Sequence, residues 1–232
     1  MRSDSTDNSS FDPTWDEIYN GGRMLNRYPY DAVVAFVYRH APRDKPRGET
    51  SIVEVGCGAA NNLWFAAREG FRVAGIDGAP AAIEAAIQRF RAEGLSGDLR
   101  VSDMVALPFE SASFDLAIDR GGITCLPISA AQQAIAEIQR TLKPGGKLFF
   151  NPASRESTSF LEASESVNGT CLNIRSGTFQ GVGHITFYDL ASIHSLFDSA
   201  RWRILSSEHA IFRDEAAGGT THAEWRCVIS RV

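Results

Sequence analysis

The most constraining feature of this sequence is a pair of glycines, Gly56 and Gly58, between a short β-branched run and a helix-forming segment. The run spans residues 51–55, and the helix is predicted over 61–69, just before Gly70. Glycine allows the backbone to turn tightly at such a place and to approach a ligand closely. A tight strand-to-helix turn that binds nothing would show the same pattern. The motif therefore predicts an α/β unit. The turn in it either binds a ligand or has a structural role alone.

Strand and helix patterns alternate after this motif, which indicates right-handed crossovers and a parallel sheet with helices on both faces. The strands are expected at 51–55, 72–76, 99–102, 114–119 and 147–151, and the helices at 61–69, 80–92 and 129–142. Further along, a helix is expected at 190–200 and an antiparallel hairpin at the sheet edge from 203–210 and 223–230. We expect an α/β fold with a doubly wound, mostly parallel seven-stranded sheet that ends in this hairpin.

Composition and charge exclude several classes of protein. The chain has 232 residues and a net charge of −5, which disfavours nucleic acid as a partner because phosphate-backbone affinity needs clustered Lys and Arg. No apolar run approaches the roughly 18 residues of a membrane span, and the polar N-terminus lacks the apolar core of a signal peptide. The four cysteines are widely spaced and form no metal-ligand or disulfide pattern. We expect a cytoplasmic protein with no metal site and no membrane partner.

Two acidic residues lie where such a sheet binds ligands, outside the carboxyl ends of its strands. Asp77 ends the second strand and could accept hydrogen bonds from both hydroxyls of a ribose, or could instead cap the following turn or helix. Glu54 lies in the first strand, where a carboxylate could compensate a cationic ligand group. Glu54 would repel the pyrophosphate of NAD, and Asn61 stands where the dinucleotide motif has glycine or alanine. These residues argue against the alternative of an NAD-dependent oxidoreductase.

Later segments complete a recognisable order of motifs. They are Asp103-Met104 before residues 106–109, the strand at 114–119 that ends in Asp119, and the Leu-Lys-Pro-Gly-Gly turn at 142–146. With the glycine loop and Asp77, they resemble a class I S-adenosylmethionine-dependent methyltransferase over about residues 50–151. The loop departs from the family pattern at Ala60, which stands at its last glycine. The resemblance implies a Rossmann-like methyltransferase fold with S-adenosyl-L-methionine as the cofactor.

The resemblance assigns roles to the matching positions. The cofactor-binding set that it implies is Glu54, Gly56, Cys57 and Gly58 for the methionine part, Asp77 and Gly78 for the ribose, and Asp103 and Met104 for the adenine. Asp119 would border the cofactor and, with Arg120, face the transferable methyl group and the acceptor. The alternative for Asp119 is a cap at the strand end, and for Arg120 a solvated surface arginine.

The resemblance also implies that a leading helix covers the cofactor as a lid, with Tyr19 and Arg27 closing on it. The alternative is that the aromatic residues of this segment pack on the sheet as core. His184, in a glycine-flanked stretch, is the candidate general base, or else an ordinary partly exposed histidine. Peripheral positions are expected for the other histidines, His40, His194, His209 and His222.

We expect residues 1–49 to form lid or cap helices, and residues 50–232 to form a single methyltransferase domain with a substrate-pocket insertion at about 152–185. The predicted function is in-line transfer of the methyl group of S-adenosylmethionine to a small-molecule acceptor. A non-catalytic module that binds S-adenosylmethionine is the other open reading. No motif identifies the acceptor, the atom methylated, the need for a general base or the oligomeric state.

Overall fold

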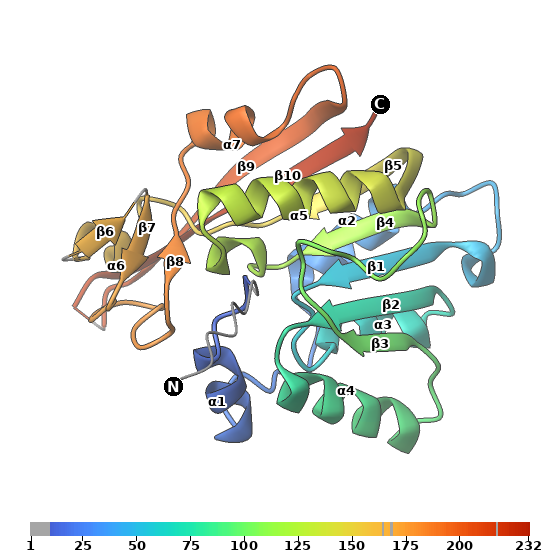
Figure 1. Cartoon of the computed structure of the whole chain (residues 1–232), viewed down its shortest axis with the longest axis horizontal. Coiled ribbons are helices and arrows are strands. Elements are labelled where there is room, and N and C mark those ends of the chain that lie inside the picture. The colour runs from blue at the N-terminus through green and yellow to red at the C-terminus, as the bar shows by residue number, and fades with distance from the viewer. Residues whose placement is uncertain (1–9, 164, 168, 217) are drawn as a thin grey trace, which may run out of the picture.

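The computed structural model describes residues 10–163, 165–167, 169–216 and 218–232, and its centre is a seven-stranded sheet (Figure 1). The strands run in the spatial order β3-β2-β1-β4-β5-β10-β9. The first five in this order are parallel, and β10 is antiparallel to both of its neighbours. Their bounds are β1 Ser51–Val55, β2 Arg72–Asp77, β3 Asp98–Val101, β4 Phe114–Asp119, β5 Leu142–Phe150, β9 Trp202–Asp214 and β10 Thr220–Arg231. The expected mostly parallel sheet with a C-terminal antiparallel hairpin is confirmed.

One face of this sheet is covered by the helices α2 (Asp31–His40), α3 (Asn61–Arg68) and α4 (Pro80–Ala92). Their apolar side chains form one buried cluster with Ile52 of β1 and Leu116 of β4. Because successive side chains of a strand point to opposite faces, the neighbours of these residues face the other side of the sheet.

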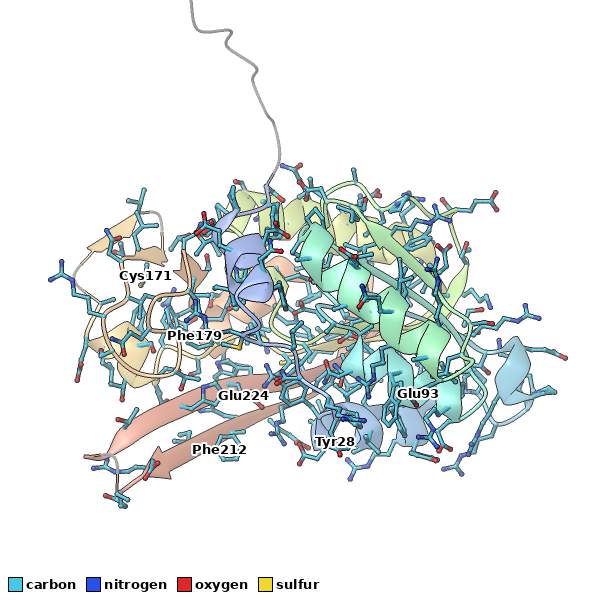
Figure 2. All side chains as sticks on the ribbon, turned by 90° about the horizontal axis from the view of Figure 1, so that it is seen from below. Tyr28, Glu93, Cys171, Phe179, Phe212 and Glu224 are labelled. Carbon is cyan, nitrogen blue, oxygen red and sulfur yellow. The ribbon has the colours of Figure 1, made fainter. Side chains whose placement is uncertain are left out.

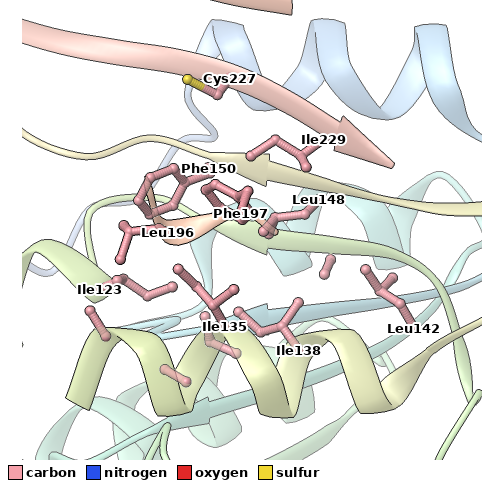
Figure 3. Close-up of a cluster of buried hydrophobic side chains, with 14 of the residues drawn as sticks. Ile123, Ile135, Ile138, Leu142, Leu148, Phe150, Leu196, Phe197, Cys227 and Ile229 are labelled. Atoms are coloured by element: carbon pink, nitrogen blue, oxygen red, sulfur yellow. The ribbon is translucent and has the colours of Figure 1, made fainter. Parts of the chain in front are cut away.

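The other face is covered by α5 (Ile128–Thr141) and α7 (Leu190–Leu196). Ile135 of α5 lies in one cluster with Leu148 and Phe150 of β5 (Figure 3). The doubly wound arrangement is therefore confirmed, with a separate apolar core on each side of the sheet.

Several details of local structure differ from the expectation. β5 begins at Leu142 instead of 147, and the helix expected at 190–200 ends at Leu196. α5 begins at Ile128, and Pro127 precedes it without a side-chain cap.

β9 and β10 extend well beyond the expected 203–210 and 223–230, because the two strands pair out to Asp214 and Thr220. β10 also lies inside the sheet, between β5 and β9. Because β10 is antiparallel to β5, the first residues of β10 lie at the end of the sheet where the parallel strands have their carboxyl ends.

The insertion at 152–185 has more structure than its composition indicates. It contains a small antiparallel sheet of β6 Glu165–Val167, β7 Thr170–Leu172 and β8 Ile185–Thr186, and the short helix α6 Thr158–Leu161. Ile18 of α1 (Thr14–Asn20) packs with Cys171 and Phe187 in a third apolar cluster. α1 also contacts α4, so it bridges the insertion and the main sheet (Figure 1).

The N-terminal region expected at 1–49 divides in two. α1 lies over the carboxyl ends of the strands, whereas α2 packs into the sheet core through Val33, Phe36 and Val37. The first nine residues of this region lie outside the described residues. No helix in the described part of the chain combines the length and the hydropathy needed to cross a bilayer.

Candidate active site

A cavity of about 280 Å³ lies at the carboxyl ends of β1, β2, β4 and β5. This is the edge at which open α/β sheets bind ligands. The glycine loop forms one wall, and Trp15 and Tyr19 of α1 form another. Phe179 and Val182 of the insertion complete the enclosure. Figure 2 shows α1 between the insertion and α4, where it covers this edge of the sheet.

The glycine loop presents main chain to the cavity because a side chain has no room there. Gly56 and Gly58 have φ angles of +62° and +53°, in the left-handed region that favours glycine. A Cβ on Gly56 would lie 2.9 Å from the Cα of Gly122, and one on Gly58 would lie 2.6 Å from the hydroxyl of Tyr19. Ala60 keeps a φ of +56° where the family pattern has glycine. The loop is therefore shaped for close approach of a ligand to the backbone.

Glu54 is buried at the end of β1, with an exposed fraction of 2%. Asn62 of α3 donates a hydrogen bond of 2.7 Å to its Oε1. Its Oε2 is buried and has no hydrogen-bond partner among the described residues. Burial raises the pKa of Glu54 to about 8, although the bond from Asn62 opposes the shift. A cationic ligand group at Oε2 would favour the ionised carboxylate.

Asp77 lines the cavity and also caps the structure around it. Its Oδ2 accepts the backbone N–H of Gly58 at 2.8 Å, and its Oδ1 accepts that of Ala79 at 2.9 Å. The turn-capping alternative is therefore present in the structure. Burial raises the pKa of Asp77, although these two bonds oppose the shift. Each carboxylate oxygen retains a second lone pair that a ligand hydroxyl can use.

The position implied for adenine is covered by the N-terminal strap, defined as residues 10–13. Ser10 donates two hydrogen bonds to the carboxylate of Asp103, from its backbone N–H at 2.7 Å and from its hydroxyl at 2.5 Å. The ring of Phe11 lies directly against Gly78. Met104 lines the same cavity. A ligand that bonds to Asp103 through this face competes with the strap.

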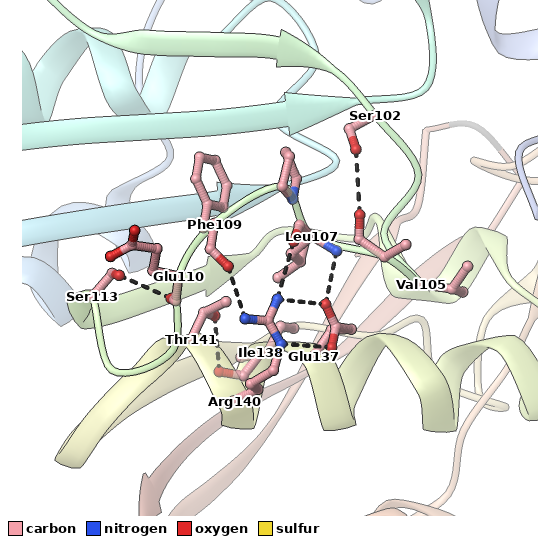
Figure 4. A network of polar contacts seen from close by, with 12 residues as sticks. Ser102, Val105, Leu107, Phe109, Glu110, Ser113, Glu137, Ile138, Arg140 and Thr141 are labelled. Atoms are coloured by element: carbon pink, nitrogen blue, oxygen red, sulfur yellow. Dashed lines mark hydrogen bonds and ion pairs between the residues drawn. The ribbon is translucent and has the colours of Figure 1, made fainter.

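The segment that follows β3 is held in place by α5 (Figure 4). Arg140 donates to the carbonyls of Leu107 and Phe109 at 3.0 and 2.7 Å. Glu137 accepts the N–H of Leu107 at 2.9 Å and forms an ion pair of 2.7 Å with Arg140. This network fixes the cavity-lining residues of the segment relative to the sheet.

Asp119, the last residue of β4, and Arg120, which follows it, have different structural roles. Asp119 is fully buried, and its Oδ1 accepts the N–H of Ile123 at 2.8 Å. It caps the turn below the cavity, as the alternative reading has it, and burial raises its pKa to about 7. Arg120 lines the cavity, with its guanidinium 4.0 Å from the ring centroid of Tyr30 and 3.4 Å from Glu224. Arg120 is therefore not a solvated surface arginine.

Three polar residues on one face of β10 belong to this site, and sequence reasoning missed them. His222 and Glu224 line the cavity, and Arg226 donates to Glu224 at 2.8 Å. Figure 2 labels Glu224 on β10, near Phe179 of the insertion. Burial opposes ionisation of Glu224, but the bond from His222 and the charges of the neighbouring arginines lower its pKa to about 2.

The expected peripheral position of His222 is wrong, because β10 inserts beside β5 and starts at the carboxyl edge of the parallel strands. Part of this pattern was present in the sequence. Glu224 and Arg226 alternate along the strand predicted at 223–230, and His222 comes just before it, so the three share one face once the strand extends to Thr220. Such a row of ionisable side chains in an interior strand indicates a site rather than a solvated face.

Three of the predicted site residues do not line the cavity: His184, Arg27 and Asp119. The Nδ1 of His184 lies 3.2 Å from the Oδ2 of Asp12, which does line it. The Arg27 side chain is exposed, and its carbonyl accepts a hydrogen bond from Arg89. Asp119 lies beneath the cavity, and the structure brings the other predicted cofactor residues together.

Four buried polar atoms that have no hydrogen-bond partner among the described residues belong to side chains lining the cavity. They are the Nε1 of Trp15, the Oε2 of Glu54, the Oδ1 of Asn151 and the Nδ1 of His222. Native structures leave few buried polar atoms unpaired. The set contains donors and acceptors and extends from β1 to β10, so it fits a polar ligand that is cationic near Glu54.

Among known families, one described as a methyltransferase domain matches residues 52–146 of this chain. The matched segment begins in β1 and ends within β5, so it includes the glycine loop, Asp77 and Asp103.

Individual relatives match a similar part of the chain. A ubiquinone biosynthesis O-methyltransferase from Methylocella silvestris is 34% identical over 123 residues, which is 53% of this chain and 46% of that protein. A tRNA N(3)-methylcytidine methyltransferase from Schizosaccharomyces pombe is 32% identical over 128 residues, which is 51% of this chain and 41% of that protein. The chain thus spans less than half the length of either relative.

The fold also matches solved structures. A crystal structure described as a SAM-dependent methyltransferase from Methanosarcina mazei superposes with a TM-score of 0.69 at 19% identity. The superposition covers 88% of this chain and 99% of that one. The likeness in fold therefore covers most of this chain.

Proposed function

We propose that this chain, which carries a class I S-adenosylmethionine-dependent methyltransferase domain, transfers the methyl group of S-adenosylmethionine to a small-molecule acceptor by in-line displacement. The observation that carries the proposal is the cavity at the glycine loop, with the buried carboxyl of Glu54 on its wall. In an NAD site this carboxyl would repel the pyrophosphate. The methyltransferase match over residues 52–146 supports methyl transfer over hydride transfer.

The residues of the chain bind the cofactor, orient it and enclose it. When bound, the cofactor supplies a methyl group on a positively charged sulfur, so positioning is the main task of the protein. Glu54 would face a cationic group of the cofactor, and Asp77 would accept ribose hydroxyls through its remaining lone pairs. The main chain at Gly56 and Gly58 allows close approach, and Tyr19 covers the site against water.

Enclosure of the cavity by α1 and the insertion supports a small acceptor. The net charge of −5 disfavours a nucleic-acid backbone. The relative named for ubiquinone biosynthesis supports a small molecule, whereas the relative that acts on tRNA supports an RNA base. Methyl transfer to tRNA in a radiolabelled assay would contradict a small-molecule acceptor.

The first test is calorimetric titration of the full chain with S-adenosylmethionine and with S-adenosylhomocysteine. We expect saturable binding of both with a dissociation constant near the micromolar range, about −8 kcal/mol. Absence of heat and of thermal stabilisation with either compound would overturn the proposal. A titration with NAD serves as the control for the competing reading.

A second prediction concerns the N-terminal strap. Phe11→Ala is expected to tighten binding of S-adenosylhomocysteine by about tenfold, because the lost apolar contact of the strap no longer competes with the ligand. Leu25→Ala is the matched control, since Leu25 is an exposed apolar residue of the same N-terminal region. Weaker binding in Phe11→Ala would show that the ring packs on the ligand instead of in its place.

A further inference from the structure

We propose that His222 is the general base of the transfer, that Glu224 positions it, and that the acceptor is a small aromatic hydroxyl compound. This inference rests on the proposed methyl transfer and names its acceptor side. It is carried by the geometry of β10, by the charges around it and by the apolar walls of the cavity.

The hydrogen bond between His222 and Glu224 fixes the tautomer of the imidazole. The Nε2 of His222 lies 3.3 Å from the Oε2 of Glu224. Glu224 has a pKa of about 2, so it is an acceptor only, and Nε2 therefore carries the hydrogen. The Nδ1 atom is left with a lone pair. It is buried and has no partner among the described residues, although the ring lines the cavity. An O–H donor from an acceptor molecule would satisfy it.

The charges at this end of the cavity favour an acceptor that loses a proton. Arg120 comes from the end of β4, and Glu224 and Arg226 come from β10. Arg120 and Glu224 line the cavity, and Arg226 pairs with Glu224. A developing oxyanion near His222 would be stabilised by the guanidinium of Arg120.

The walls around His222 fit a flat ring. The ring centroid of Phe179, in the insertion, lies 5.9 Å from that of His222, and both side chains line the cavity. Leu126 and Val182 add apolar surface to the cavity. An aromatic hydroxyl compound combines the acidic O–H that His222 and Arg120 favour with a ring that these walls can bury.

The step balances as a single displacement. The acceptor O–H proton passes to Nδ1 of His222 while an electron pair on the acceptor oxygen forms the new bond to the methyl carbon. The carbon–sulfur bond breaks, its electron pair stays on sulfur, and the sulfur becomes neutral. The imidazolium is stabilised by the Glu224 carboxylate and then releases its proton to solvent.

The test uses 4-nitrophenol, whose ionised form absorbs visible light and whose methyl ether does not ionise. The full chain is saturated with S-adenosylhomocysteine, and the absorbance of bound probe is followed against pH. We expect the midpoint of ionisation to fall by about one pH unit or more on binding, because cationic groups favour the phenolate. His222→Gln and Glu224→Gln are expected to return the midpoint toward its value in solution, and His194→Gln on α7 is the matched control.

With S-adenosylmethionine in place of the product, His222→Gln is expected to lower the rate of probe methylation by about 100-fold. A wild-type protein that does not bind the probe, or binds it without ionisation, overturns the proposal, and this outcome requires no variant to fold. A His222→Gln variant with wild-type behaviour also overturns it. Calorimetry with S-adenosylhomocysteine on the same samples tests the proposed function separately, since cofactor binding without probe ionisation contradicts only the acceptor-side inference.

Discussion

Glu54→Gln is expected to make the ligand-free protein more stable than the wild type at alkaline pH while weakening cofactor binding. Burial raises the pKa of Glu54 to about 8 from an ordinary value of 4.5. Between these two values the folded chain keeps a proton that the unfolded chain has lost, so the stability of the wild type falls as the pH rises. Above the folded pKa this loss is complete. Glutamine carries no titrating group and still accepts the bond from Asn62.

Urea unfolding in the absence of ligand measures this effect. Between about pH 6 and about pH 8, we expect the free energy of unfolding of the wild type to fall by about 2 kcal/mol more than that of Glu54→Gln. Glu110→Gln is the matched control, because Glu110 is exposed. Parallel curves for the wild type and Glu54→Gln would contradict the buried, protonated state of Glu54.

The same substitution tests the role of Glu54 in binding. A charge-assisted hydrogen bond contributes about 1.5–3 kcal/mol, so affinity for S-adenosylhomocysteine is expected to fall by about 10- to 100-fold in Glu54→Gln. Binding of a cationic group also favours the ionised carboxylate, so the wild type is expected to release a proton on binding near neutral pH. Calorimetry in two buffers of different ionisation enthalpy measures that proton, and Glu54→Gln should release less. Equal affinity and equal proton release in both proteins would remove Glu54 from the site.

Gly56→Ala is expected to abolish most cofactor binding, with a loss of affinity of about 100-fold or more. Two physical effects combine at this position. The φ angle of +62° is strained for alanine, and the new Cβ would lie 2.9 Å from the backbone Cα of Gly122. Because the contact is with main chain, two loops must separate, and this disturbs the wall that approaches the ligand. We expect a loss of stability of about 2–4 kcal/mol, of which about 1–2 kcal/mol is backbone strain.

Gly145→Ala is the control that separates these effects. Gly145 has a φ of +76°, but a Cβ there meets no atom within 4 Å. It should therefore lose about 1–2 kcal/mol of stability from strain alone and retain its affinity for S-adenosylhomocysteine. Urea unfolding and calorimetry on both variants give the comparison. Similar affinities for the two variants would show that close packing against Gly122 is unimportant for binding.

Local sequence patterns predicted most of the fold. The strand ending at Gly56, the helix before Gly70 and the later strand–helix pairs all follow from hydrophobic periodicity and glycine positions, which depend on residues close in the chain. The placement of Glu54, Asp77 and Asp103 around one cavity follows from the same information, because the carboxyl ends of parallel strands meet at one edge of the sheet.

The other walls of the cavity depend on contacts between distant segments of the chain. His184 has suitable chemistry and a glycine context, but in the fold it contacts Asp12 of the strap and does not line the cavity. His222 was expected to be peripheral, and the placement of β10 beside β5 brings it to the cavity. The hydrogen bond from Ser10 to Asp103 likewise joins residues that lie far apart in the sequence.

The sequence alone determined the strand–loop–helix units and the side chains at the ends of the parallel strands. Each unit is set by the period of its own apolar residues and by glycines that the backbone requires locally. Only the tertiary structure decided which strand lies beside β5, where the strap rests and which histidine reaches the cavity. These outcomes depend on the packing of whole elements against one another, a balance of burial and pairing that no short segment encodes.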